Sequence, residues 1–300
     1  MAARPGYRTG AMSYELRSEL PTLDRPVLVV HLTGWIDASG AGAAALAALN
    51  DECDTTLLAT FDGDDYIDYR ARRPTMELRE GVNTRLVWDD IELRVGRDSA
   101  QHDILTLTGP EPDSRWREFA AAVSGLAVQL GVRQMVALGA YPYATPHTRS
   151  PRLSSSSPSA EVLADLPFLK NSVDVPAGMS SVLEHALSGS GIASLGIWVQ
   201  VPHYVSAMSY PAATAALLQG LQEVTGIRVA ASEIAHEAET QRHRIDQLID
   251  GNEEHAAMVA KLEALYDHAG EQTMSLGDPQ IPSGDDLAAE FERFLREQDN

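Results

Sequence analysis

Acidic, basic and imidazole side chains recur in this sequence directly after short apolar segments. These side chains lie in loops, and they are Asp37, Arg73, Glu111, Asp113, His147, Arg149 and His203. If the apolar segments are parallel strands, their carboxyl ends share one edge of a sheet, which is where ligands bind in open α/β proteins. We therefore expect the seven side chains, together with Gly34 in the first loop, to form one rim of mixed charge. The arginines would hold an anion, and Glu111 or Asp113 would act as a general base.

The same residues also have a purely structural interpretation. Loop acids and arginines commonly pair with each other or cap helices, and Asp113 comes one residue before the predicted start of a helix. His147 and His203 have no identified partner in the sequence, which is more typical of a hydrogen-bonded structural histidine than of a catalyst. The sequence identifies no complete set of catalytic residues.

Several kinds of site are excluded by missing motifs. The chain lacks a Gly-x-Ser-x-Gly elbow, a His-Glu-x-x-His pair and a P-loop. Residues 40–45 fit a loose dinucleotide fingerprint, with Asp62 at the expected distance, but the first glycine comes about seven residues too late after the strand. Close packing of an Ala/Gly-rich helix is the favoured explanation. We predict no metal and no cofactor, and the acidic neighbours of Cys53 make it a poor nucleophile.

The elements that would position the rim alternate along the first 230 residues. Continuous apolar runs predict strands buried on both faces at 27–32, 56–61, 103–107, 135–138 and 193–201. Helices are expected at 38–49, 114–130 with Ser114 as its cap, 181–187 and 210–224. Residues 62–74 and 139–161 are expected to be irregular, and short strands are expected at 85–88 and 91–95. This order predicts an α/β layered sandwich with a mixed, largely parallel sheet.

Three regions are predicted: a loose N-terminal arm at 1–12, an α/β core at 13–228, and a helical region at 229–300. The helical region is expected to begin with a two-helix hairpin whose second helix is capped by Asp250 or Asn252. A linker then leads to a short amphipathic helix whose apolar face carries Leu287, Phe291, Phe294 and Leu295.

Composition restricts the partners and the compartment. The 300 residues are 44% hydrophobic, which is enough for a large core, and they carry a formal net charge of −20. A negative field of this size disfavours binding to nucleic acid or to anionic membranes. The single cysteine is typical of a reducing compartment, and the first residues lack the apolar region of a secretory signal. We therefore expect a cytoplasmic protein.

Six segments at the strand ends resemble a known family. They are 34–38, 70–74, 109–113 with Trp116, 146–149, 175–180 and 198–204. Their residues and order resemble bacterial members of the proteasome assembly chaperone family, of the second-subunit type, from about residue 25 onward. The resemblance implies a phosphorylase/hydrolase-like α/β sandwich and a homo-oligomer, with a trimer as the expected state. No catalytic residues of the family are known that could be transferred.

Two functions remain open at this stage. The first is a non-enzymatic assembly or interaction protein, with proteasome subunits as the implied partners. Some relatives dock on the proteasome with a hydrophobic-Tyr-any tail, whereas this chain ends in Glu297 to Asn300 and lacks that motif. The second is a small-molecule hydrolase, phosphorylase or ligand binder, which requires that the rim residues converge in one concave pocket.

Overall fold

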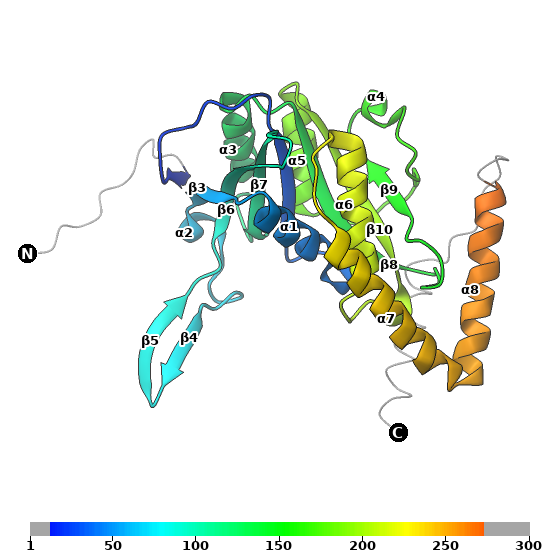
Figure 1. The fold of residues 1–300 in the computed structure, drawn as a ribbon. Coiled ribbons are helices and arrows are strands. Elements are labelled where there is room, and N and C mark those ends of the chain that lie inside the picture. Colours follow the sequence, from blue (N-terminus) through cyan, green and yellow to red (C-terminus); the bar gives the residue numbers. More distant parts are fainter. Residues whose placement is uncertain (1–12, 273–300) are drawn as a thin grey trace, which may run out of the picture.

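The computed structural model describes residues 13–272. The loose N-terminal segment predicted at 1–12, the predicted last helix and the chain end lie outside the described residues. Figure 1 shows a central sheet with helices on both faces, a two-stranded hairpin that projects from one end, and two helices that project from the other. The predicted α/β fold class is confirmed.

The sheet has eight strands in the order β1-β3-β6-β7-β2-β8-β10-β9. The strand bounds are β1 Tyr14–Leu16, β2 Val27–Thr33, β3 Thr56–Phe61, β6 Ile91–Arg97, β7 Asp103–Pro110, β8 Gln134–Tyr143, β9 Leu153–Ser156 and β10 Ala193–Pro202. The central strands β7, β2, β8 and β10 are parallel, and the outer pairs on both sides are antiparallel. The sheet is therefore mixed, as predicted, with its parallel part at the centre, but it is not largely parallel, because four of its seven strand pairs are antiparallel.

All five strands that the sequence predicted from apolar runs point the same way. Strand β3 does so although it has no parallel neighbour, because β6 lies antiparallel to both β3 and β7. The loops after β2, β3, β7, β8 and β10 consequently all leave from the same end of the sheet, where these strands finish. This arrangement is the precondition for a shared rim.

Alternation along the strands divides the core into two layers. On β2, Val27 and Val29 face one side of the sheet, and Leu28 and Val30 face the other. Helices α1 (Ala41–Glu52) and α6 (Pro211–Thr225) cover the first face, and α3 (Trp116–Gln129) and α5 (Met179–Gly189) cover the second. The short helices are η1 Ala38–Gly40, α2 Gly63–Tyr66, α4 Ala160–Leu163 and η2 His203–Val205.

A hairpin that leaves the body is the largest departure from the sequence prediction. Strands β4 (Thr75–Arg79) and β5 (Val82–Val87) pair only with each other. We call residues 75–87 the arm. The sequence predicted only its second half, as a strand at 85–88, because the polar residues of β4 and the absence of a buried face hide the alternation.

Two more boundaries differ from the prediction. The predicted loop at 139–161 contains the end of β8 and the edge strand β9, whose serines pair with β10. Ser114 does not cap α3: its hydroxyl donates to the carbonyl oxygen of Asp65, and Arg115 stands before the helix with a φ of +57°. The low strand propensity of serine hides β9 in the sequence, whereas pairing with β10 and two backbone hydrogen bonds with Leu169 stabilise it.

The helical hairpin at the C-terminal end forms as predicted. Helix α7 spans Ser232–Asp250, and α8 spans Glu253–Gln272. The side chain of Asn252 accepts hydrogen bonds from the backbone of Glu254 and His255, which makes Asn252 the cap of α8. The division at residue 228 between core and helical region stays a prediction.

Candidate functional site

The loops after β2 and β7 meet at the base of the arm. Asp113 accepts a hydrogen bond from the Arg72 guanidinium at 3.0 Å and one from the backbone of Asp68 at 2.8 Å. The Arg72 guanidinium in turn packs on Gly34, where an added Cβ would lie 2.7 Å from a guanidinium nitrogen. Gly34 has a φ of +124°, so a side chain there would be strained as well as crowded. Arg72 therefore links two predicted rim residues.

Asp37 has a structural role at the start of α1. Its carboxylate accepts hydrogen bonds from the backbone N–H groups of Gly42 at 2.8 Å and Ala43 at 3.0 Å. Buried His31 approaches the same carboxylate at 3.3 Å and packs on Gly42, where an added Cβ would lie 2.6 Å from the ring. Gly42 thus permits close helix–strand packing, which is the explanation that the sequence favoured over a dinucleotide site.

Glu111 occupies the start of α5. One of its carboxylate oxygens accepts a hydrogen bond from the backbone N–H of Met179 at 2.6 Å. The first N–H groups of a helix lack intrahelical partners and attract negative charge. Gly178 allows the approach, because an added Cβ would lie 3.2 Å from the same oxygen and 3.1 Å from the Trp35 ring. The carboxylate is therefore committed to capping α5.

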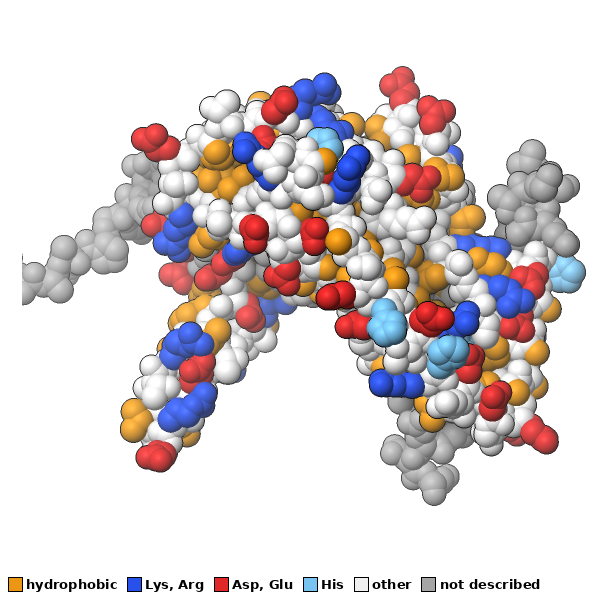
Figure 2. Space-filling model, in the orientation of Figure 1, with side chains coloured by type: hydrophobic (Ala, Val, Ile, Leu, Met, Phe, Trp, Pro, Cys, Tyr) orange, Lys and Arg blue, Asp and Glu red, His pale blue; other side chains and the backbone are white. Residues whose placement is uncertain are grey.

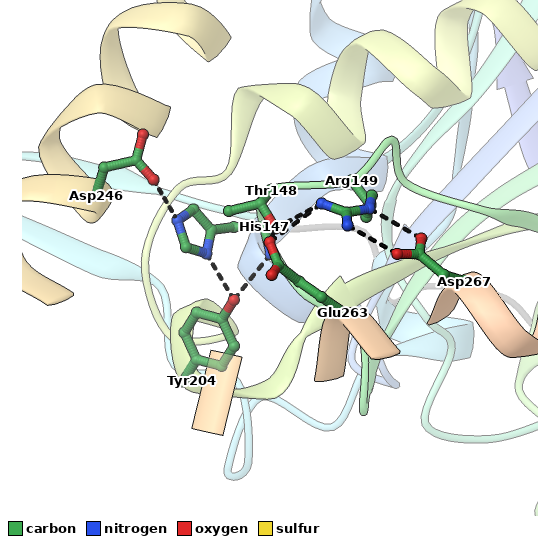
Figure 3. Close-up of polar contacts among 7 residues, drawn as sticks. All are labelled: His147, Thr148, Arg149, Tyr204, Asp246, Glu263 and Asp267. Carbon is green, nitrogen blue, oxygen red and sulfur yellow. Dashed lines mark hydrogen bonds and ion pairs between the residues drawn. The ribbon is translucent and has the colours of Figure 1, made fainter. Parts of the chain in front are cut away.

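A buried histidine joins the loop after β8 to two other elements. His147 is 4% exposed and lies between Tyr204 of η2 and Asp246 of α7, as Figure 3 shows. Tyr204 Oη accepts from the His147 backbone at 2.8 Å and lies 2.7 Å from Nδ1, and Nε2 lies 3.0 Å from Asp246. Neutral His147 with its proton on Nε2 satisfies all three contacts, since Tyr204 then donates to Nδ1.

Tyr204 is poorly suited to be a nucleophile in this arrangement. Burial raises the pKa of its hydroxyl to about 12, with smaller contributions in the same direction from Glu263 and Asp246. A hydroxyl that keeps its proton can donate to His147 at every physiological pH. The Tyr204–His147–Asp246 chain therefore holds three elements together.

The next residues of the same loop bind α8. Thr148 donates to Glu263, and the Arg149 guanidinium contacts Glu263 at 3.1 Å and Asp267 at 2.9 and 2.8 Å (Figure 3). The hydrogen bonds that Arg149 donates to Asp267 raise the pKa of Arg149, and the same bonds lower the pKa of Asp267. Both charges are therefore matched within the chain.

Arg152 and Tyr266 complete this attachment. The Arg152 guanidinium lies 3.7 Å from the centre of the Tyr266 ring and donates to the Tyr266 carbonyl, and the Tyr266 hydroxyl donates to the carbonyl of Ser150. A cation over an aromatic face contributes about 0.5–2 kcal/mol. We call residues 147–152 the clasp loop, because one short segment holds both α7 and α8.

The predicted rim residues thus form separate groups. Gly34 and Asp113 meet through Arg72, and His147 meets the ring of His203 through Tyr204. Asp37, Glu111 and Arg149 are each engaged by a different helix, and Arg73 is exposed beside the arm. Within residues 13–272, no contact joins the Arg72 group to the His147 group. Their role in ligand binding stays a prediction.

Five residues that bind the predicted ones were not among the predicted site residues. They are Arg72, Tyr204, Asp246, Glu263 and Asp267. One signal was available, because Glu263 and Asp267 are four residues apart and so share a helix face that an arginine can bridge. The pairing of Asp113 with Arg72 rather than Arg73 depends on the path of the loop and has no signature in spacing.

The remaining reactive groups of the described chain are inert or scattered. Burial, aided by Asp98 and the two neighbouring acids, raises the pKa of the Cys53 thiol to about 12. No three His, Cys, Asp or Glu side chains within residues 13–272 are placed to hold a metal ion. A surface groove between α3 and α5 contains none of the rim residues; it is lined by Arg117, Ala121, Gly125, Val182 and Ala186, among others. No helix in this part of the chain is long and apolar enough to cross a membrane.

Comparison with known proteins gives a family and several solved structures. The sequence model of the PAC2 family matches residues 31–249, and no curated protein matches the chain. A Corynebacterium glutamicum protein of unknown function is 34% identical with a TM-score of 0.81, and the match covers 87% of this chain and 99% of that one. A Mycobacterium tuberculosis protein of unknown function is 35% identical with a TM-score of 0.80, covering 92% of this chain and 96% of that one.

A third structure carries a more specific description. It is a proteasome-assembly chaperone homologue from Mycobacterium tuberculosis, 31% identical to this chain, with a TM-score of 0.72. The match covers 78% of this chain and 99% of that one. The resemblance noted at the strand-end segments is therefore confirmed by the sequence model and by solved structures.

Proposed function

Because the chain belongs to the PAC2 family, we propose that it is a non-enzymatic assembly or interaction protein and that its copies associate through the arm. The observation that carries this proposal is the apolar surface of the arm. Met76 and Leu86 pair across the two strands, and both are about half exposed, as is Leu78. Figure 2 shows the arm standing clear of the body with hydrophobic side chains on its surface.

The arm needs a partner surface for physical reasons. An isolated two-stranded hairpin is marginally stable in water, and its unpaired strand edges are templates for pairing with another chain. The Glu77–Arg85 ion pair at 2.6 Å is the main polar link across the arm. Burial of the apolar side chains against a second copy would stabilise the hairpin. A trimer is the state that the family resemblance implies.

The engagement of the rim residues supports a non-enzymatic role. Asp37 and Glu111 bind helix starts, Asp113 binds Arg72, and His147 and Arg149 bind α7 and α8. A general base or an anion ligand has to reach a substrate. A substrate would have to displace an internal hydrogen bond at each of these positions, which argues against the small-molecule alternative.

We propose proteasome subunits as the partners of the assembled protein, in a cytoplasmic setting. The support is the description of the 31% identical relative as a proteasome-assembly chaperone homologue. Purified proteasome subunits mixed with this protein should yield assembly intermediates faster than without it, as followed by native mass spectrometry. An unchanged assembly rate and no co-migrating complex would reject this partner.

The association itself is tested by the mass of the particle in solution. The variant Met76→Ser/Leu78→Ser/Leu86→Ser should shift the protein from an oligomer to a monomer in light scattering, with an unchanged circular dichroism spectrum. The matched control Glu77→Gln/Arg85→Gln alters the other face of the arm and should remain oligomeric. A monomeric wild type, or a triple variant of unchanged mass, would contradict the proposal.

A further inference from the structure

Glu184 is a buried carboxyl group that belongs neither to the rim nor to the arm. It lies on α5 over β10 and the edge strand β9 and is 4% exposed. Its single described hydrogen-bond donor is the Ser156 hydroxyl of β9, at 3.4 and 3.3 Å from the two carboxyl oxygens. Buried Asp98, by contrast, accepts four hydrogen bonds of 2.8–2.9 Å. Glu184 is thus a carboxyl group with weak compensation for its burial.

Among residues 13–272, no element around Glu184 supplies a compensating charge. On the sheet, β2 and β8 present apolar side chains to this layer, among them Leu28 and Ala137. From α3, the polar group that reaches α5 is the hydroxyl of Ser124, which binds Ser190. His185, the next residue of α5, is exposed, and Arg117 lies in the surface groove beyond Val182.

Three polar atoms crowd over one glycine of β10. An added Cβ at Gly196 would lie 2.8 Å from Glu184 Oε1, from Ser156 Oγ and from Trp198 Nε1. Any side chain at this position would push the carboxyl group away from the sheet. The close approach of α5 to β9 and β10 therefore depends on the Glu184–Ser156 contact. An ionised carboxylate would weaken this contact, because Glu184 has one long hydrogen bond and no counter-charge.

The strand on the other side of this contact is β9, and displacing it costs little free energy. β9 has four residues, three of them serine, at the edge of the sheet. On its outer side β9 exchanges two backbone hydrogen bonds with Leu169, and residues 171–177 just beyond this contact are exposed throughout. Regions with little buried apolar surface open locally at low free-energy cost. We infer that the Glu184–Ser156 contact is a proton-dependent joint between α5 and the edge strand β9, which loosens as the pH rises through neutrality.

The sign of the effect follows from proton linkage. Burial raises the pKa of Glu184 from 4.5 to about 7, and the Ser156 hydrogen bond offsets only part of this. When the joint opens, water reaches the carboxyl group and its pKa returns toward 4.5. The closed state binds more protons than the open state, so closure is favoured at low pH and the stabilisation is lost as the pH rises through about 7.

Hydrogen exchange measures the opening directly. Between about pH 6 and about pH 8.5 the opening equilibrium of β9 should rise about tenfold in the full-length wild type, after correction for intrinsic exchange. Glu184→Gln keeps the shape without the charge and should remove this rise. His185→Gln, which alters the exposed neighbour, should retain it.

Two results would overturn the inference. One is a wild type whose β9 amides show no excess pH dependence, and the other is a Glu184→Gln variant that keeps the wild-type dependence. If Glu184→Gln does not fold, the carboxyl titration of the wild type, followed by carbon NMR, replaces it. A Glu184 midpoint near neutrality supports the joint, and a midpoint near that of an exposed glutamate rejects it.

Discussion

The arm and the helical hairpin α7–α8 both project from the sheet, but they are attached in opposite ways. The helical hairpin is held by Ile245, which is buried in the core layer of α1 and α6, and by polar side chains of the clasp loop, which reach Asp246, Glu263 and Asp267. The arm has its own ion pair and turns an apolar face to solvent. The polar groups that hold the helical hairpin are already paired within the chain, so the hairpin needs no partner. The apolar side chains of the arm are exposed, so the arm gains stability from one. The charged side chains at the strand ends therefore attach parts of the same chain to each other, whereas the arm offers a surface to a partner.

The largest effect is expected at the centre of the clasp. His147→Ala removes a buried ring, leaves the Tyr204 hydroxyl proton without its acceptor and leaves Asp246 without its donor, which costs about 2–4 kcal/mol. Hydrogen exchange in α7 should increase and the midpoint of thermal unfolding should fall. His255→Ala, at an exposed position of α8, is the control and should leave both unchanged. Equal effects of the two substitutions would show that the clasp does not hold α7.

A second effect concerns the segment that leads into α7. Asp98 accepts hydrogen bonds from the backbone of Arg228 and from the ring and backbone of His102. Burial alone would raise the pKa of Asp98, but these hydrogen bonds lower it below 3.8. Its stabilisation is therefore present above the unfolded-state pKa and is lost as the pH falls through the lower folded-state value.

Asp98→Asn should cost about 1–3 kcal/mol of the free energy of unfolding at neutral pH. The difference from the wild type should shrink in strongly acidic solution, where Asp98 is also protonated. Urea unfolding at a series of pH values measures both quantities. A difference that is constant with pH would mean that the carboxylate is not the stabilising group.

A smaller effect is expected at the outer part of the clasp. Arg149 and Asp267 are partly exposed, so salt screens their attraction. Arg149→Ala should increase proteolysis within α8 at low salt, and the difference from the wild type should narrow at high salt. Arg70→Ala, an exposed arginine near the arm, should not change cleavage in α8. A salt-independent effect of Arg149→Ala would point to packing rather than charge.

The smallest effect on folding is expected in the arm. Leu86→Ser removes an exposed side chain, so the unfolding free energy of the isolated subunit should change by less than about 0.5 kcal/mol. The same substitution should weaken self-association, which dilution in light scattering detects. A large loss of subunit stability would show that the arm packs on its own body.

The sequence was sufficient for the parts of the fold in which burial imposes a pattern. Apolar runs such as 27–32 predicted the five strands that point the same way, and helix α8 begins after Asn252, one of its two predicted caps. Strands β4 and β9 were not predicted, because an exposed hairpin and an edge strand need no continuous apolar run. Their pairing is set by tertiary contacts.

The candidate site divides in the same way. The strand ends identified the loops correctly, but spacing alone does not reveal that Asp37 binds α1 or that Arg149 binds α8. Residues more than 100 positions apart along the chain, such as Arg149 and Asp267, meet only because the helical hairpin folds back. Mixed charge at strand ends therefore has two meanings, a ligand site or an internal attachment, and the geometry favours the second.

The contrast between the two projections is tested most directly by hydrogen exchange of the wild type at high and low protein concentration. We expect the amides of residues 75–87 to be protected at high concentration and to lose this protection on dilution, while α7 and α8 exchange at the same rate in both samples. Concentration-independent exchange of the arm, with changes confined to α7 and α8, would contradict this expectation.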